Sequence, residues 1–111
     1  EGHGIAVDLS GDVSVTGYFE GTATFDSHME YTSGDSNLFV AKLNSSGLWQ
    51  WTASAGYNDA DEGHGIAVDS IGSIYVTGFY SKWLSTNDEA GSSNINYHST
   101  GERDVFIGKV S

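Results

Sequence analysis

The chain has 111 residues, of which 15 are acidic and four are basic, so its formal net charge is −11. A nucleic-acid-binding protein needs a basic surface to meet phosphates, and anionic lipid headgroups repel so acidic a surface, so neither nucleic acid nor a membrane is an expected partner. The sequence has no cysteine for disulfides or thiol chemistry, and no apolar run approaches the roughly 20 residues that span a bilayer.

The first strands are predicted from alternation and turn chemistry. Residues 4–8 place Ile5 and Val7 on one face of a strand, with the small Ala6 between them. The Gly in the turn at 10–12 reaches positive φ without steric cost, and β-branched side chains then indicate a second strand from residue 13. Gly17 at its end predicts a close approach of two backbones.

Residues 20–36 are predicted to form a long loop, because Gly, Ser, Thr and acidic residues dominate them. A third strand is predicted at 38–43 and a fourth at 48–54, with a tight turn at 44–47 between them. In the fourth strand we expect Trp49 and Trp51 to share one face and to pack between sheets.

The octapeptide Glu-Gly-His-Gly-Ile-Ala-Val-Asp occurs twice, at 1–8 and at 62–69. Aligning residues 1–19 on 62–80 gives 12 identities at a constant offset of 61. A long period of this kind indicates a repeat architecture, here with repeats at 1–61 and 62–111. The second repeat has a loop predicted at 80–103 and a third strand at 104–109, and it lacks a counterpart of the fourth strand.

Each repeat is thus predicted to be a four-stranded antiparallel sheet, with no helical periodicity anywhere. A lone sheet of this kind would leave apolar residues on both faces, whereas the blades of a β-propeller cover both faces of their neighbours. We therefore predict an all-β fold of β-propeller blades, in two repeats of which the second is incomplete.

At these residues the sequence resembles the bacterial β-propeller repeat family labelled SBBP. The resemblance implies a secreted or cell-surface bacterial protein with many such repeats, and it implies no catalytic residue, cofactor or ligand. One departure is His3 and His64, where the family commonly has an aromatic residue. The matching segments are Gly2–Asp8, Val15–Gly17, Phe39–Leu43, Ser46–Gly47 and Trp49–Gly56, then Gly63–Asp69, Tyr75–Gly78 and Phe106–Lys109.

Two repeats make an arc, since propellers close with roughly four to eight blades. The last strand would then be an unpaired edge that carries Phe106, Ile107 and Val110, and such edges pair with other chains. We expect the partners to be further blades of the same longer chain, which we favour, or copies of the chain that close a ring or extend a filament.

The loop from fourth to first strand lies on the same side of a propeller as the loop from second to third. Residues 58–62 should therefore lie beside both long loops, and this is the expected binding face. Asp59, Asp61 and Glu62 there supply oxygen ligands of the type calcium prefers, although their spacing falls short of an EF-hand. A solvated acidic turn is the alternative, and no other cofactor is expected.

The long loops also carry side chains of the kind that hold sugar rings. Alternatively, these side chains pack each loop onto its own blade. They are Tyr80, Trp83, Tyr97, His98 and Arg103 in the second loop, and His28 and Tyr31 in the first.

His3 and His64 occupy equivalent positions near the starts of the innermost strands. In a closed ring they would line one mouth of the central channel, where they could hold a metal or an anion, although they have no ligand spacing of their own. They could equally be semi-exposed polar residues.

No catalytic motif is present, so we expect no enzyme activity. The leading hypothesis is a non-catalytic structural and interaction module, a scaffold or assembly subunit. A glycan-binding propeller is the alternative, and a calcium-dependent module comes third.

Overall fold

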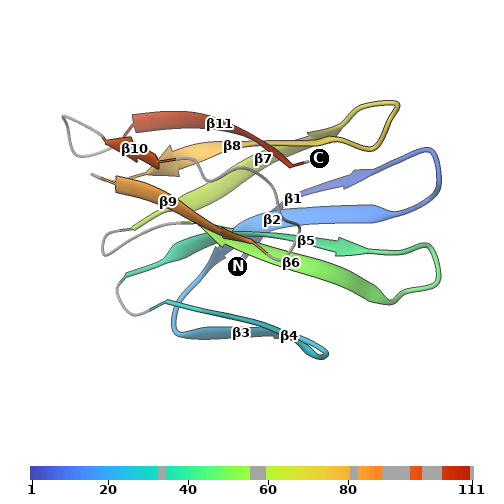
Figure 1. The fold of residues 1–111 in the computed structure, drawn as a ribbon, viewed down its shortest axis with the longest axis horizontal. Coiled ribbons are helices and arrows are strands. Elements are labelled where there is room, and N and C mark those ends of the chain that lie inside the picture. The colour runs from blue at the N-terminus through green and yellow to red at the C-terminus, as the bar shows by residue number, and fades with distance from the viewer. Residues whose placement is uncertain (33–34, 56–59, 81–82, 89–95, 99–103, 111) are drawn as a thin grey trace.

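The computed structural model describes residues 1–32, 35–55, 60–80, 83–88, 96–98 and 104–110. All regular structure in these ranges is β-strand, eleven strands in antiparallel pairs (Figure 1). The all-β prediction is therefore confirmed. None of the described residues forms a helix that could cross a membrane.

The first sheet contains the four predicted strands, in chain order. They are β1 (Gly2–Val7), β2 (Val13–Phe19), β5 (Asn37–Leu43) and β6 (Trp49–Ala55). Each strand pairs antiparallel with the next, as consecutive hairpins require. This sheet is the four-stranded unit expected of a propeller blade.

The second sheet has three strands in the order β11-β8-β7. They are β7 (Glu62–Val68), β8 (Ile74–Tyr80) and β11 (Asp104–Val110). β7 packs against β1, β2 and β5, so the first strand of the second sheet lies on one face of the first sheet (Figure 1). β11 is the outer strand.

Three hairpin turns share one construction and lie at the same end of the sheets (Figure 1). Each begins with an Asp or Asn whose Oδ1 accepts two backbone N–H bonds, and a Gly with positive φ follows three residues later. Gly tolerates that φ without the clash a Cβ would cause. The pairs are Asp8 with Gly11, Asn44 with Gly47, and Asp69 with Gly72.

Both predicted long loops contain hairpins, so the prediction of loops at 20–36 and 80–103 was wrong. β3 (Thr22–Phe25) pairs with β4 (His28–Tyr31), and β9 (Trp83–Asp88) pairs with β10 (Asn96–His98). The first turn is made by Asp26 at φ 55, a conformation usually signalled by Gly. β9 also pairs with β6, which extends the first sheet.

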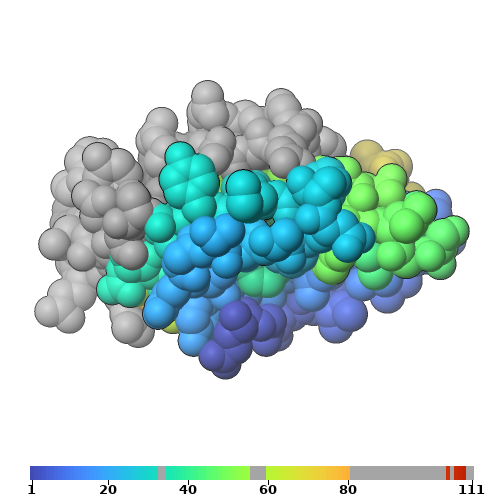
Figure 2. Space-filling model, turned by 90° about the horizontal axis from the view of Figure 1, so that it is seen from below, coloured from blue at the N-terminus to red at the C-terminus, as the bar shows by residue number. Residues whose placement is uncertain are grey.

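The core has two parts, one on each face of the first sheet. The larger cluster lies between the sheets, where Leu38 and Val40 meet Ile74, Val76 and Tyr80. The smaller cluster joins the first sheet to the β3–β4 hairpin. It contains Phe19, Phe39 and Ala41, with Val15, Ala23, Phe25 and Trp49 packed around them. Figure 2 shows this hairpin, blue to cyan, covering its face, with the dark blue N-terminal residues exposed beside it.

The two tryptophans of β6 do not share a face, contrary to the prediction. Trp51 packs on the cluster between the sheets, whereas Trp49 packs on the hairpin side, with its ring 4.9 Å from that of Phe25. The register shifts at this point, since Lys42 pairs with Trp51 and Leu43 with Trp49. Gln50 is thus the extra residue of a β-bulge, which breaks the alternation of side chains.

Candidate functional site

A β-bulge at the start of each repeat places a histidine at the junction of the two sheets. Gly2 pairs with Gly17 and Gly4 with Thr16, so His3 is the extra residue of β1. His64 is the extra residue of β7 in the same way, between Gly63 and Gly65. Bulges of this kind aim a side chain away from the regular pleat.

The two strands bring His3, Glu62 and His64 together. One donor atom of each side chain lies within 4.8 Å of the others, and the two imidazole rings are 4.5 Å apart. His64 Nε2 lies 3.0 Å from Glu62 Oε1. The side chains of His3, Glu62 and His64 are 26%, 21% and 45% exposed, so solvent reaches the group, which we call the His–Glu cluster.

Aromatic side chains support both histidines from equivalent positions. His3 stacks on Tyr18 and His64 on Phe79, each with ring centroids 5.6 Å apart. The Tyr18 hydroxyl donates to Glu1 Oε2, which keeps this carboxylate near His3. That hydrogen bond lowers the pKa of Glu1 and raises the pKa of Tyr18.

Close packing of backbones holds the two strands that carry the cluster. A Cβ on Gly63 would lie 2.2 Å from Thr16 Oγ1 of the first sheet. A Cβ on Gly17 would lie 1.9 Å from the Glu1 carbonyl oxygen, and one on Gly78 would lie 1.9 Å from that of Glu62. The close approach predicted at Gly17 is confirmed, and it recurs in the second repeat.

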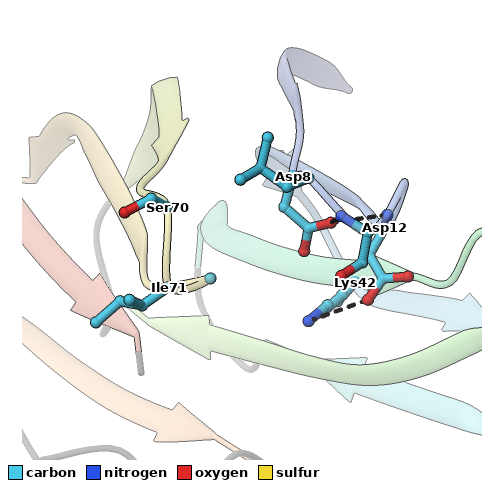
Figure 3. Close-up of a pocket in the computed structure, with 8 residues that line it drawn as sticks. Asp8, Asp12, Lys42, Ser70 and Ile71 are labelled. Atoms are coloured by element: carbon cyan, nitrogen blue, oxygen red, sulfur yellow. Dashed lines mark hydrogen bonds and ion pairs between the residues drawn. The ribbon is translucent and has the colours of Figure 1, made fainter.

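A hollow of about 280 Å³ lies at the other end of the strands, between the β1–β2 and β7–β8 turns (Figure 3). Its acidic groups already have partners: Asp8 Oδ1 accepts from the backbone N–H groups of Ser10 and Asp12, and Asp12 pairs with Lys42 at 3.5 Å. These contacts show that the carboxylates of Asp8 and Asp12 stabilise the β1–β2 turn and its contact with Lys42.

The two sheets also expose corresponding surfaces at opposite ends. Ile66 and Val68 of β7 pack between the sheets, whereas their repeat equivalents Ile5 and Val7 are 68% and 63% exposed. Leu38 and Val40 of β5 are each 4% exposed beneath the second sheet. Their equivalents, placed by identical pairing to β8 and β2, are Val105 and Ile107, which are 78% and 71% exposed. We call Ile5 and Val7 the front face, and Val105 and Ile107 the back face.

A family model described as "SBBP: Beta-propeller repeat" matches residues 50–78. The chain carries an SBBP β-propeller repeat. The matched segment runs from β6 through β7 into β8, so it crosses the junction between the sheets and includes Glu62 and His64. No curated protein matches the chain.

Two of the three carboxylates suggested for calcium lie in the described part of the chain. Asp61 is fully buried, and its backbone N–H donates to the Ser36 carbonyl, which ties the linker to the end of residues 20–36. Glu62 belongs to the His–Glu cluster. Asp59 lies outside the described residues.

Of the residues suggested for glycan binding, Tyr80, His28 and Tyr31 have described side chains. Tyr80 is 5% exposed and belongs to the core between the sheets. His28 and Tyr31 lie on β4, where Tyr31 is 71% exposed. Trp83 lies on β9, and Tyr97 and His98 lie on β10. The side chains of these three residues, and the whole of Arg103, lie outside the described part of the chain. On the predicted assembly edge, Ile107 is exposed, and the side chains of Phe106 and Val110 are likewise not described.

Sequence reasoning missed the third member of the cluster. It singled out the two histidines at equivalent positions, but it grouped Glu62 with Asp59 and Asp61, as a calcium ligand or as part of a solvated acidic turn. The available signal was the recurrence of Glu two residues before each His, at Glu1 and Glu62.

Proposed function

We propose that the chain is a non-catalytic structural and interaction module of a secreted or cell-surface protein, whose blades assemble face to face. The observation that carries the proposal is the correspondence of the front and back faces. The aliphatic residues that β5 and β7 bury at the junction have exposed equivalents at the two ends of the pair. On the first sheet this exposed part lies beside Val15 and Phe19, which the β3–β4 hairpin covers. The occupant that fits each face is therefore another blade of the same repeat.

The internal junction serves as the template for this contact. There Ile66 and Val68 pack toward Leu38 and Val40, so the front face of one chain should pack on the back face of the next. Burying one such aliphatic side chain contributes roughly 1.5–3 kcal/mol, before the entropic cost of association. The contact is heterologous, because each copy uses two different surfaces, and it gives a ring or a filament according to its rotation.

Sedimentation velocity with two double variants tests the proposal. The front variant carries Ile5→Asp and Val7→Asp, and the back variant carries Val105→Asp and Ile107→Asp. We expect the wild-type chain to self-associate with rising concentration and each variant alone to remain monomeric. A mixture should form a one-to-one dimer, because one intact front face and one intact back face remain.

A matched control places aspartate at other exposed apolar positions. Leu48 and Ile71 are 59% and 84% exposed and lie in the β5–β6 and β7–β8 connections, outside the strands that carry the two faces. The variant with Leu48→Asp and Ile71→Asp should associate like the wild type. Equal loss of association in this control would show that added charge, and not a blade face, is responsible.

A tandem fusion of two chains tests whether the covering blade comes from the same polypeptide. If the faces dock within one chain, the fusion should unfold at a higher temperature than the single chain. The proposal would be overturned by a wild-type chain that is monomeric at every concentration together with a fusion that unfolds at the single-chain temperature.

A further inference from the structure

We propose that the His–Glu cluster binds a divalent transition-metal ion of the zinc class, which links the innermost strands of two successive blades. The ligands are His3 from β1 and Glu62 and His64 from β7. The site lies within one chain, so it does not depend on assembly through the front and back faces.

The ligand chemistry selects the class of metal. Two imidazole nitrogens and one carboxylate oxygen form the set found with zinc where three protein ligands leave a fourth position open. Calcium prefers six to eight oxygen ligands, which this group does not supply. Copper and nickel also bind imidazole, and the general order of affinities places copper above zinc.

The distances are compatible with a single ion. Bond lengths of about 2.0–2.2 Å place the ligand atoms of a tetrahedral zinc roughly 3.3 Å apart. The three donor atoms lie within 4.8 Å of one another, and His64 Nε2 is already 3.0 Å from Glu62 Oε1. The partly exposed side chains of the three ligands would therefore need to approach one another further when the ion binds.

The surroundings hold the ligands and favour a cation. Tyr18 and Phe79 stack against the two imidazoles, and the strands beneath them approach too closely to admit a Cβ at Gly63. The Glu1 carboxylate lies 3.7 Å from His3 Nε2, which adds a second negative charge beside the cluster. Partially buried side chains on paired strands lose little freedom when the ion binds.

The ion would act on the junction between the blades. It would add metal–ligand bonds between β1 and β7, two strands that pack together and whose histidine rings lie tilted against each other. Because a ligand bound by the native state alone stabilises that state, zinc should raise the unfolding temperature. The open fourth position can take water or a donor atom from a partner.

Isothermal titration calorimetry of the metal-free chain with zinc chloride tests the site. We expect one ion per chain for the wild type, and His3→Gln, Glu62→Gln and His64→Gln should each lower the affinity at least about tenfold, as loss of even outer-shell partners does. His28→Gln is the matched control, because His28 lies on the β3–β4 hairpin outside the cluster. Calcium chloride should give no binding.

Two further readouts complement the titration, and the first of them needs no variant. Copper(II), a paramagnetic probe of the same site, should broaden the amide signals of β1 and β7 in the wild-type NMR spectrum before those of other strands. Zinc should raise the unfolding temperature of the wild type and of His28→Gln, and leave that of His64→Gln unchanged. Titrations of the back variant repeat the measurement on a monomer, so failure of assembly cannot be mistaken for failure of the site.

The proposal would be overturned by the absence of zinc binding at submillimolar concentrations. It would also be overturned if His28→Gln lowered the affinity as much as His64→Gln, or if copper broadened other strands first.

Discussion

The imidazole ring of His3 lies 4.5 Å from that of His64, although the two residues are separated by a whole repeat. Each histidine is the extra residue of a bulge, and each stacks on the aromatic residue that follows the same Val-Thr-Gly sequence. The same local arrangement, a bulged histidine stacked on an aromatic residue, therefore occurs in both repeats and creates a contact between the blades. The close pairing of strands at this arrangement also predicts which glycines cannot be replaced without loss of stability.

Gly78→Ala should destabilise the protein, because the added Cβ would meet the Glu62 carbonyl oxygen at 1.9 Å and the Gly63 Cα at 3.0 Å. Both atoms belong to the backbone, so β7 and β8 must separate, at a cost of about 1–3 kcal/mol. Gly2→Ala is the control, since a Cβ there has nothing within 4 Å, and its effect should stay within about 0.5 kcal/mol. Urea unfolding measures both free energies, and equal effects would contradict the close approach.

The buried carboxylate of Glu30 predicts an energetic link between the β3–β4 hairpin and β6. Glu30 is 5% exposed, and its two oxygens accept hydrogen bonds from the hydroxyls of Thr52 and Ser54. Glu30→Ala leaves these buried hydroxyls without that acceptor and should lower the free energy of unfolding by about 1–3 kcal/mol.

A double-mutant cycle of Glu30→Ala with Thr52→Val isolates the contact, with an expected coupling of about 0.5–3 kcal/mol. Glu20→Ala, at an exposed position, is the control and should change stability by less than about 0.5 kcal/mol. Strict additivity in the cycle would show that the hairpin packs on β6 without this bond.

The free energy of unfolding at acidic pH should depend on Asp69. Burial raises the pKa of its carboxyl, but hydrogen bonds from the Ser73 and Ile71 backbone and from the Tyr75 hydroxyl, with the nearby Lys109 charge, outweigh burial and hold the pKa below its usual value. A lowered pKa contributes stability that is present above the unfolded-state pKa and lost as the pH falls through the folded-state pKa.

The change should therefore appear below about pH 4, the usual range of an aspartate. Asp69→Asn keeps an oxygen for the backbone bonds but removes the titration, so its stability should fall less steeply than that of the wild type between pH 5 and pH 2. Tyr75→Phe should bring the Asp69 pKa upward, which carboxyl NMR can follow. Parallel pH profiles for wild type and Asp69→Asn would contradict the assignment.

The blade itself could be predicted from sequence because its signals are local. Strand alternation and a Gly in each tight turn mark the β1–β2, β5–β6 and β7–β8 hairpins, and the octapeptide marks the repeat. The β3–β4 hairpin could not be predicted in this way, because its strands have only four residues each and its turn uses Asp26 in place of Gly. It is stabilised by Phe25 and Glu30 packing on a sheet that the local sequence does not describe.

The candidate site could be predicted only in part, for a similar reason. Equivalent positions of His3 and His64 were visible in the repeat, but their separation depends on how one blade packs on the next. The β7 bulge aims His64 into the cluster beside Glu62, and the sequence marks that bulge only by its flanking glycines. Tertiary packing decides both.

The bulge at Gln50 predicts that the two tryptophans of β6 stabilise different parts of the molecule. Trp49 contacts Phe25 of the hairpin, and Trp51 packs on the cluster that joins the two sheets. Trp49→Ala should therefore speed amide hydrogen exchange in β3 and β4, and Trp51→Ala should speed exchange in β7.

Each substitution removes a large, partly buried ring, so each should lower the free energy of unfolding by about 2–4 kcal/mol, somewhat below the range for fully buried aromatic residues. Deleting Gln50 would remove the bulge and make the two tryptophans neighbours in a regular strand, where adjacent side chains point to opposite faces, so this variant should keep amide protection in both the hairpin and β7. If Trp49→Ala instead exposed the amides of β7 and left the hairpin protected, both rings would belong to the junction between the sheets.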